Sequence, residues 1–571
     1  MNIRFIVKIV LFHLGSLLLL TNCTSKKQPI GNTTQHPNIL LIVADDLGFT
    51  DLGCFGSEIP TPNLDALAAK GIIGTSFCTA PTCSPTRSML LSGVVTHRNG
   101  YGTMEGDWAD NQKGLRGYEG YLNWEVVTFP KLLQDAGYHT SLAGKWHQAF
   151  PAKEQTLWPY NRGFTRSFCM QQGGAGHFFD KQPLLSFIPE AIYIEDSSYV
   201  EKLPKYFYSS KNYADKAIQY IDESVENQQP FFHFLSFTAP HWPLQVPDEY
   251  IDDYKGKYDE GYEVLAEKRF TKAQSLGIIS QKAIVPPLSP NVLPWEELTV
   301  EQKKHSIRTM EIYAAMIARM DFHAGRVIDH LKSIGAYENT MIVFMADNGA
   351  EGNTIMGYEG TGEWVDTTFD ISFENMGRIN SYVELGAAWA QVSSLPFKWY
   401  KAFANEGGVR APLVIKYPKK KETEQVMSHD FLSVMDLAPT FLELAGTQHP
   451  GTTYKGRKIF PMNGVSMLPW LEGKKESVHP KGKAHVWELY GRRGVRKDNW
   501  KAEWLEKPYG TSEWELYDLS NDITQQNNIA ANHPHVLEEL IKDWEVYAKE
   551  NNVTLPDRPT AYAKETIWRK E

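Results

Sequence analysis

The sequence predicts an α/β protein, a mostly parallel sheet flanked by helices, followed by a smaller C-terminal α+β subdomain. Apolar runs typical of buried parallel strands alternate with amphipathic helical segments up to about residue 470. Beyond that point, short strands with tight turns follow one another and lead into one amphipathic helix. At 571 residues, the chain is also longer than one core usually fills, which favours two units.

The N-terminal segment has the features of an export signal. Arg4 and Lys8 precede and interrupt the apolar run Phe5 to Leu20, which is too short to span a bilayer. The run leads into Leu20-Thr21-Asn22-Cys23, which resembles a bacterial lipobox with Asn22 at the position of the usual small residue. The resemblance implies a lipid anchor at Cys23 and an exported lipoprotein, periplasmic or associated with the outer membrane. A plain secretory signal cleaved nearby is the alternative.

Two strands of the predicted sheet end in pairs of oxygen-bearing side chains. One strand spans Asn38 to Ala44 and the other Thr340 to Ala346, and both are continuous apolar runs. The four residues that directly follow them are Asp45, Asp46, Asp347 and Asn348. Two acids in one loop usually form a solvated turn, but two such pairs at the carboxyl ends of strands favour a metal site. Four hard oxygen ligands without a soft donor suit Ca²⁺, with Mg²⁺ as the alternative.

A cysteine opens a short predicted helix between these two strands. Pro85 near its start, the apolar residues Met89 to Leu91 and the stop at Gly93 predict the helix. A helix N-terminus carries unpaired N–H groups, so an anion can rest beside Cys83, and Arg87 can fold back toward the same point. A lone cysteine on a helix is most often an ordinary buried residue. The helix N-terminus and Arg87 can instead hold a tetrahedral anion against Cys83 as a nucleophile, and both interpretations stay open at this point.

Lysine and histidine residues follow other predicted strands. The strand from His139 to Ala143 is followed by Lys145 and His147, and the strand from Phe231 to Thr238 by His241. A single histidine after a strand is often only a turn residue, and a lysine is usually solvated. Their position at further carboxyl ends of the same sheet favours a shared site.

The remaining elements complete the large sheet and its cover. Residues 250–300 are charged and contain prolines, which indicates an excursion from the sheet with its own helices. A long amphipathic helix is predicted from about Thr299 to Leu331. Residues Ala350 to Ser394 show little periodicity, so we expect a long loop over the site. Lys401 then precedes the strand from Leu413 to Tyr417.

The C-terminal part is predicted as an antiparallel sheet with one helix. Four short strands are expected, at Val486 to Tyr490, Gly494 to Arg496, Trp500 to Leu505 and Trp514 to Asp518. The helix is expected from His533 to Lys549.

The cysteine motif resembles the signature of type I sulfatases, because Cys-x-Pro-x-Arg is followed by Leu91-Ser92-Gly93. Matches to that family's pattern extend over residues 38 to 520. Some stretches resemble a bacterial arylsulfatase subgroup more closely: Cys83 to Leu91, Gly117 to Tyr121, Glu374 to Gly377 and Tyr400 to Phe403. The resemblance implies an alkaline-phosphatase-like fold, and it implies that a maturation enzyme oxidises Cys83 to formylglycine.

The resemblance also implies a role for each residue of the site. The implied ligands of one Ca²⁺ are Asp45, Asp46, Asp347, Asn348 and the oxidised Cys83. The implied catalytic and sulfate-binding residues are Cys83, Arg87, Lys145, His147, His241 and Lys401. In this assignment hydrated formylglycine attacks the sulfur of a sulfate monoester, His241 protonates the leaving oxygen and His147 deprotonates the second hydroxyl. The substrate is an aryl sulfate or a sulfated glycan, and aromatic residues between Tyr358 and Trp399 can stack on either.

Composition and missing motifs limit the other functions. The net charge of −10 argues against a general polyanion-binding surface, and no zinc-type cluster, P-loop, Rossmann fingerprint or nucleic-acid motif is present. The five cysteines show no disulfide framework, although a Cys54–Cys78 bridge is left open.

Two alternatives remain, a phosphate or phosphonate monoesterase on the same fold and a glycan-binding protein with a decayed site. We divide the chain into an export signal (1–23), a polar tether (24–36), a catalytic domain (37–475) and a C-terminal subdomain (476–571).

Overall fold

The computed structural model describes residues 36–356, 360–418 and 425–560. The predicted export signal, Cys23 and nearly all of the tether lie outside these residues. Within them, no helix is both long and apolar enough to cross a bilayer. Cys54 and Cys78 are both free thiols, so the bridge that the sequence left open is not formed.

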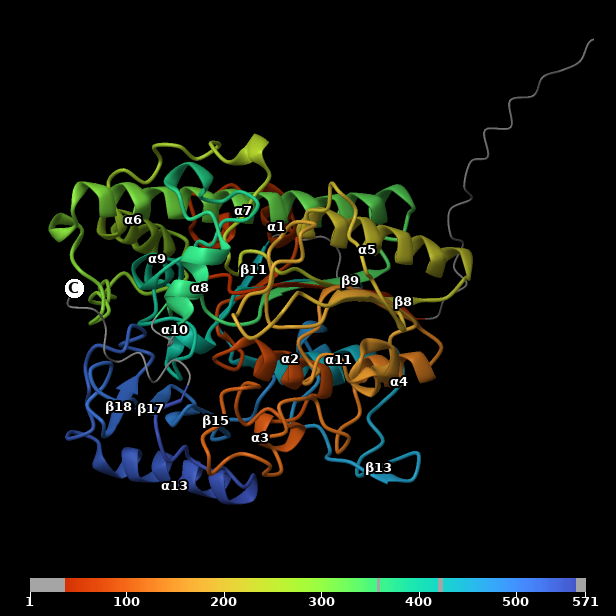
Figure 1. Cartoon of the computed structure of the whole chain (residues 1–571). Helices are drawn as coiled ribbons and strands as arrows, with labels where there is room; N and C mark the ends of the chain where they lie inside the picture. The colour runs from red at the N-terminus through yellow and green to blue at the C-terminus, as the bar shows by residue number, and fades with distance from the viewer. Residues whose placement is uncertain (1–35, 357–359, 419–424, 561–571) are drawn as a thin grey trace, which may run out of the picture.

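A ten-stranded mixed sheet forms the centre of the molecule (Figure 1). Its strands are β1 (Asn38–Ala44), β2 (Ile72–Gly74), β4 (His139–Lys145), β5 (Arg166–Met170), β6 (Tyr193–Glu195), β7 (Ser198–Tyr199), β8 (Phe231–Ser236), β9 (Thr340–Ala346), β10 (Leu413–Lys416) and β11 (Val426–Ser428). They lie in the order β11-β2-β10-β9-β1-β8-β4-β5-β6-β7. The middle of the sheet, from β9 to β5, is parallel as predicted, whereas β10, β6 and β7 run antiparallel to their neighbours.

The register of the parallel strands aligns their carboxyl ends. Ala44 at the end of β1 lies opposite Ala346 at the end of β9. Ser236 at the end of β8 lies opposite Val43 of β1 and opposite Gly144 of β4. The polar residues that follow these strands therefore leave the sheet at one edge, which is the condition for a shared site.

Helices cover both faces of the sheet (Figure 1). One face carries α1 (Pro62–Ala69), α5 (Ser209–Glu226), α6 (Tyr262–Ser275) and α7 (Val300–Ser333), and the other carries α2 (Cys83–Ser92), α4 (Phe129–Asp135) and α11 (Leu437–Leu444). The long helix predicted from Thr299 is confirmed as α7, and Thr299 caps it by accepting a hydrogen bond from the Gln302 N–H. The apolar stripe that predicted this helix, including Met310, Ile317 and Val327, is completely buried.

The C-terminal elements form the predicted antiparallel sheet and helix. The strands are β15 (Ala484–Leu489), β16 (Arg492–Lys497), β17 (Trp500–Trp504) and β18 (Trp514–Asp518), paired in chain order. Helix α13 (Pro534–Glu550) packs on this sheet and buries Leu540 against Val495, Ala502 and Leu516. Figure 1 shows the unit, in blue, beside the part of the molecule that holds α2 and α10 (Glu406–Val409).

The segment predicted as a long loop, Ala350 to Ser394, is only partly a loop. It contains two short helices, α8 (Thr361–Thr368) and α9 (Ala387–Ser393). Helices of eight and seven residues present few apolar positions, so periodicity in the sequence is too short to reveal them. Packing against the rest of the protein stabilises α9 despite its short length, because its Trp389 and Val392 are buried in the main core.

Candidate active site

Cys83 is the first residue of α2, as predicted, and the whole helix is buried. The preceding residue, Thr82, is extended, and the helix ends at Gly93, whose left-handed backbone lets its N–H bond the Met89 carbonyl. The sequence placed Pro85 at the first helical position, but it is the third residue of the helix, where its missing N–H still costs no intrahelical bond. Burial raises the pKa of the Cys83 thiol, so the unmodified side chain is a poor nucleophile.

Arg87 links the cysteine helix to the ends of the central strands. Its Nε donates to Oδ2 of Asp347 at 2.9 Å, and an Nη donates to the Ser236 hydroxyl at 2.6 Å. The guanidinium also approaches Asp45, at 3.7 Å. Arg87 thus folds back from its helix to the edge of the sheet, where β1, β8 and β9 end.

Two buried lysines hold the aspartates of the first pair. Nζ of Lys145 donates to both carboxylate oxygens of Asp45, at 2.8 and 2.7 Å. Nζ of Lys401 lies 2.9 Å from Oδ2 of Asp46 and 2.9 Å from the carboxylate of Glu351. Although burial opposes their charged forms, these carboxylates raise the pKa of both lysines, so both remain cationic.

The acidic residues converge on a point that fits a divalent cation. One ligand atom each from Asp45, Asp347 and Cys83 can lie within 4.8 Å of the others, and the same holds for Asp45, Asp46 and His241. The Asn348 amide nitrogen donates to Oδ1 of Asp46 at 2.7 Å, while its buried Oδ1 has no hydrogen-bond partner among the described residues. An oriented, unsatisfied oxygen beside three carboxylates is the donor set of a hard cation.

The net charge of this cluster also favours a bound divalent cation. Four carboxylates, of Asp45, Asp46, Asp347 and Glu351, face three cations, Arg87, Lys145 and Lys401. The sum is −1, which a dication would turn to +1. A cluster with a net charge of +1 attracts a singly charged anion, such as a monoester of a strong acid.

The two histidines contact different carboxylates. His241 Nε2 lies 3.4 Å from Oδ2 of Asp46, and its Nδ1 donates to the Trp242 carbonyl at 2.6 Å. His147 Nε2 contacts Glu105. Burial lowers the pKa of both imidazoles, most strongly for His241, so both are neutral when the site holds no anion.

All ten residues singled out from the sequence are thus buried at one edge of the sheet. Sequence reasoning missed three polar residues that contact them, Glu105, Glu351 and Ser236. Glu351 lies three residues after Asn348, so its proximity to the second oxygen pair was a usable signal. Glu105 stands in a loop without periodicity and gave no signal.

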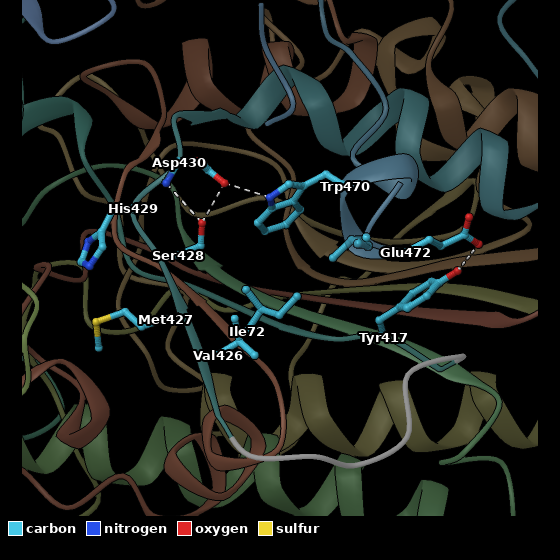
Figure 2. Close-up of a pocket in the computed structure, with 11 residues that line it drawn as sticks. Ile72, Tyr417, Val426, Met427, Ser428, His429, Asp430, Trp470 and Glu472 are labelled. Carbon is cyan, nitrogen blue, oxygen red and sulfur yellow. Dashed lines mark hydrogen bonds between the residues drawn. The ribbon is translucent and has the colours of Figure 1, made fainter. Parts of the chain in front are cut away.

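A separate pocket lies away from this site, against the edge strand β11 (Figure 2). Two pairs of its polar side chains bond each other, with Trp470 Nε1 donating to Asp430 at 2.9 Å and Tyr417 donating to Glu472 at 2.9 Å. None of the ten residues lines it. This pocket is therefore separate from the site at the carboxyl ends of the strands.

Two family models match the chain. The model described as sulfatase matches residues 37–447, and the model described as N-sulphoglucosamine sulphohydrolase, C-terminal, matches residues 396–549. Together they cover the large sheet, the ten site residues and the C-terminal sheet.

Individual relatives agree with the family models. The chain is 43% identical over 540 residues to an uncharacterized sulfatase of Schizosaccharomyces pombe, covering 92% of this chain and 96% of that one. It is 38% identical over 434 residues to the arylsulfatase of Klebsiella aerogenes, covering 76% and 91%. The structure is similar to that of Ps i-CgsB in complex with k-i-k-neocarrahexaose, with a TM-score of 0.65, 24% identity and coverage of 94% and 97%. From the extent of these matches, the chain belongs to the sulfatase family and is a hydrolase of sulfuric esters.

Proposed function

We propose that the protein hydrolyses sulfate monoesters with formylglycine at position 83 and one bound Ca²⁺. The observation that carries the proposal is the convergence of Cys83, Arg87, two buried lysines and the oxygen pairs 45–46 and 347–348 at one edge of the sheet. A buried thiol with a raised pKa is an inert group in itself, which supports the view that residue 83 acts after oxidation.

Asp45, Asp46, Asp347 and Asn348 would hold the cation, with residue 83 completing the set. The bound cation would act as a Lewis acid toward the sulfate oxygens. Ca²⁺ accepts six to eight oxygen ligands in flexible geometry, whereas Mg²⁺ demands a near-ideal octahedron. Three carboxylates and an amide drawn from two strand ends favour Ca²⁺.

The other residues bind the sulfate and move protons. Once oxidised and hydrated, residue 83 supplies one hydroxyl to attack sulfur and a second whose deprotonation releases inorganic sulfate. Lys145, Lys401 and Arg87 stabilise the charge on the sulfate oxygens, which is commonly the largest catalytic contribution. His241 protonates the leaving oxygen, since an anion bound beside it raises the pKa that burial lowers. His147 takes the proton of the second hydroxyl.

The proposed substrate is a sulfated glycan rather than a simple aryl sulfate. The N-terminal segment supports an exported lipoprotein anchored at Cys23, a setting that suits the use of external polysaccharides. The solved relative Ps i-CgsB was crystallised with k-i-k-neocarrahexaose, whereas the relative with 38% identity is named arylsulfatase. A panel of sulfated sugars and one aryl sulfate, assayed side by side, would rank the two classes.

Two measurements on the purified protein test the proposal. Mass spectrometry of the peptide that spans residue 83 should show formylglycine in place of cysteine, installed by the maturation enzyme of the host. Aryl sulfate should be hydrolysed much faster than the matching aryl phosphate. Full activity with an intact thiol would rule out the nucleophile, and faster phosphate hydrolysis would favour the monoesterase alternative. Tight glycan binding without any turnover would favour a binding protein.

A further inference from the structure

Glu105 connects the two segments that flank the reacting centre. One of its carboxylate oxygens contacts His147 Nε2, and the other accepts a hydrogen bond from the Ser84 hydroxyl at 2.9 Å. Ser84 directly follows Cys83, and His147 lies in the loop after β4. The His147 side chain is 5% exposed and that of Glu105 15%, so the contact is largely shielded from water.

The loop that carries Glu105 is held on both sides. The preceding residue, Met104, packs against Ala402, the neighbour of Lys401, and against Leu489 and Tyr490 of the C-terminal sheet. Two residues beyond Glu105, Asp107 accepts a hydrogen bond from the Tyr490 hydroxyl at 3.4 Å. Glu105 is therefore fixed in space by packing, which a residue needs if it is to orient another.

We propose that Glu105 is a positioning residue that keeps the proton of neutral His147 on Nε2 and leaves Nδ1 as the nitrogen that can accept a proton. A carboxylate can only accept hydrogen bonds, so the nitrogen that contacts it must carry the proton. Nδ1 of His147 is buried and has no hydrogen-bond partner among the described residues. The arrangement is that of a carboxylate–imidazole pair, which fixes the tautomer and stabilises the imidazolium that forms later.

This inference rests on the proposed role of His147 as the base that acts on residue 83. The proton leaves the free hydroxyl of the sulfated residue and goes to Nδ1, while the carbon–oxygen bond to sulfate breaks, the aldehyde forms again and inorganic sulfate departs. The proton is later lost to solvent, so the imidazole is regenerated. During that interval both ring nitrogens carry protons, and the Glu105 carboxylate balances the positive charge. Burial, Lys145 and Arg87 all disfavour the positive charge on the His147 ring. Glu105 is therefore the group that stabilises this charge.

The first test measures the tautomer directly and does not need a working enzyme. In the full chain with ¹⁵N-labelled histidine, the His147 ring signals, assigned from their loss in His147→Gln, should show a proton on Nε2 and none on Nδ1. In Glu105→Gln the amide can donate as well as accept, so a population with the proton on Nδ1 should appear. Glu105→Asp keeps the charge and should keep the parent tautomer. A proton on Nδ1 in the parent, or an unchanged spectrum in Glu105→Gln, would overturn the inference.

The second test follows activity against pH. Glu105→Gln should lower kcat by about 10- to 100-fold, the usual cost of losing a residue that orients an active-site group, with little change in KM. Because the carboxylate raises the His147 pKa, its removal should move the acidic limb of the kcat profile to lower pH. Glu105→Asp should recover part of both effects.

Glu119→Gln is the matched control. Glu119 lies in the same glycine-rich segment and accepts a hydrogen bond from the Gly117 N–H at 2.9 Å, but it has no contact with His147. Its replacement should leave kcat and the pH profile unchanged. Equal losses in both glutamate variants, with no shift of the acidic limb, would indicate a merely structural loop and overturn the inference. A parent with the expected tautomer but no sulfate ester hydrolysis would count against the proposed function instead.

Discussion

The molecule buries two clusters of charged side chains, and they are built on opposite plans. The active-site cluster consists of Asp45, Asp46, Asp347, Glu351, Arg87, Lys145 and Lys401. The interface cluster, between the large sheet and the C-terminal sheet, consists of Glu406, Arg410, Arg496 and Lys501. In the interface cluster three cations surround one carboxylate, with Lys501 at 2.8 Å, Arg410 at 2.5 Å and Arg496 at 3.7 Å from Glu406.

The difference lies in which groups converge. In the interface cluster three cations meet one carboxylate, and Arg496 also donates to the Ser76 hydroxyl at 3.0 Å. In the active-site cluster oxygen atoms of several carboxylates converge within 4.8 Å, beside an asparagine oxygen without a partner. Buried charge alone therefore does not mark a functional site. Convergence of carboxylate oxygens does, because these are the ligands that a hard cation takes.

The largest effect is expected from Asp347→Asn, which removes one of the converging charges. Turnover should fall by at least about 10³-fold, because both the Arg87 contact and the cation are weakened. Bound Ca²⁺ per chain, measured by elemental analysis, should fall with it. Normal metal content and normal turnover in this variant would contradict the claim that the converging carboxylates of the active-site cluster bind a cation.

Glu406→Gln tests the interface cluster in the same way. Leaving its cations without a partner should lower the free energy of unfolding by about 3–5 kcal/mol at pH 7, while Ca²⁺ content stays unchanged. Although burial opposes it, the surrounding cations hold the pKa of Glu406 well below its usual range. Its stabilisation is therefore present above the unfolded pKa, near 4.3, and is lost as the pH falls below that value. Urea titrations at pH 7 and in acid should show parent and variant converging; a difference independent of pH would contradict this account.

His241→Ala sharpens the description of the active-site cluster. A sugar alkoxide needs a proton to leave, whereas nitrophenolate does not, so activity on a sugar sulfate should fall by about 10²-fold or more and activity on nitrophenyl sulfate by less. Comparing kcat/KM on both substrates measures the gap. Equal losses on both, with sulfate retained covalently on the protein, would show that His241 and His147 have exchanged roles.

The smallest effect is expected from Glu503→Gln, beside the interface cluster. Burial raises the pKa of Glu503 to about 7, although Lys501, Lys398 and Gln525 work against this. The unfolded carboxyl ionises near pH 4.3, so Glu503 makes the folded protein progressively less stable as the pH rises from there to about 7. An amide avoids this cost, and the variant should be more stable than the parent by about 2–3 kcal/mol at pH 8, with no gain near pH 4. Thermal unfolding at both values checks it, and destabilisation at pH 8 would refute the assignment.

The sequence predicted some parts of this molecule far better than others, for physical reasons. The strands β1 and β9 were located to the residue because a fully buried strand is one continuous apolar run, and their oxygen pairs follow directly. Lys401 has no such context. It stands far from any strand end, and only the resemblance to the sulfatases selected it. Glu105 was not found, since its place depends on contacts of Met104 with residues almost 400 positions away.

The contacts around Ala402 also set an order of events during synthesis. Arg492 donates to the Ala402 carbonyl at 2.8 Å and stacks on Phe403, and Trp487 donates to the Thr79 carbonyl at 2.8 Å, just before the cysteine helix. Neither partner exists until nearly 500 residues have been translated. The segments that carry residues 83 and 401 cannot form these contacts until the C-terminal sheet has been synthesised. Until then the cysteine helix lacks these contacts, and Cys83, which is 2% exposed in the finished protein, does not yet have its complete cover.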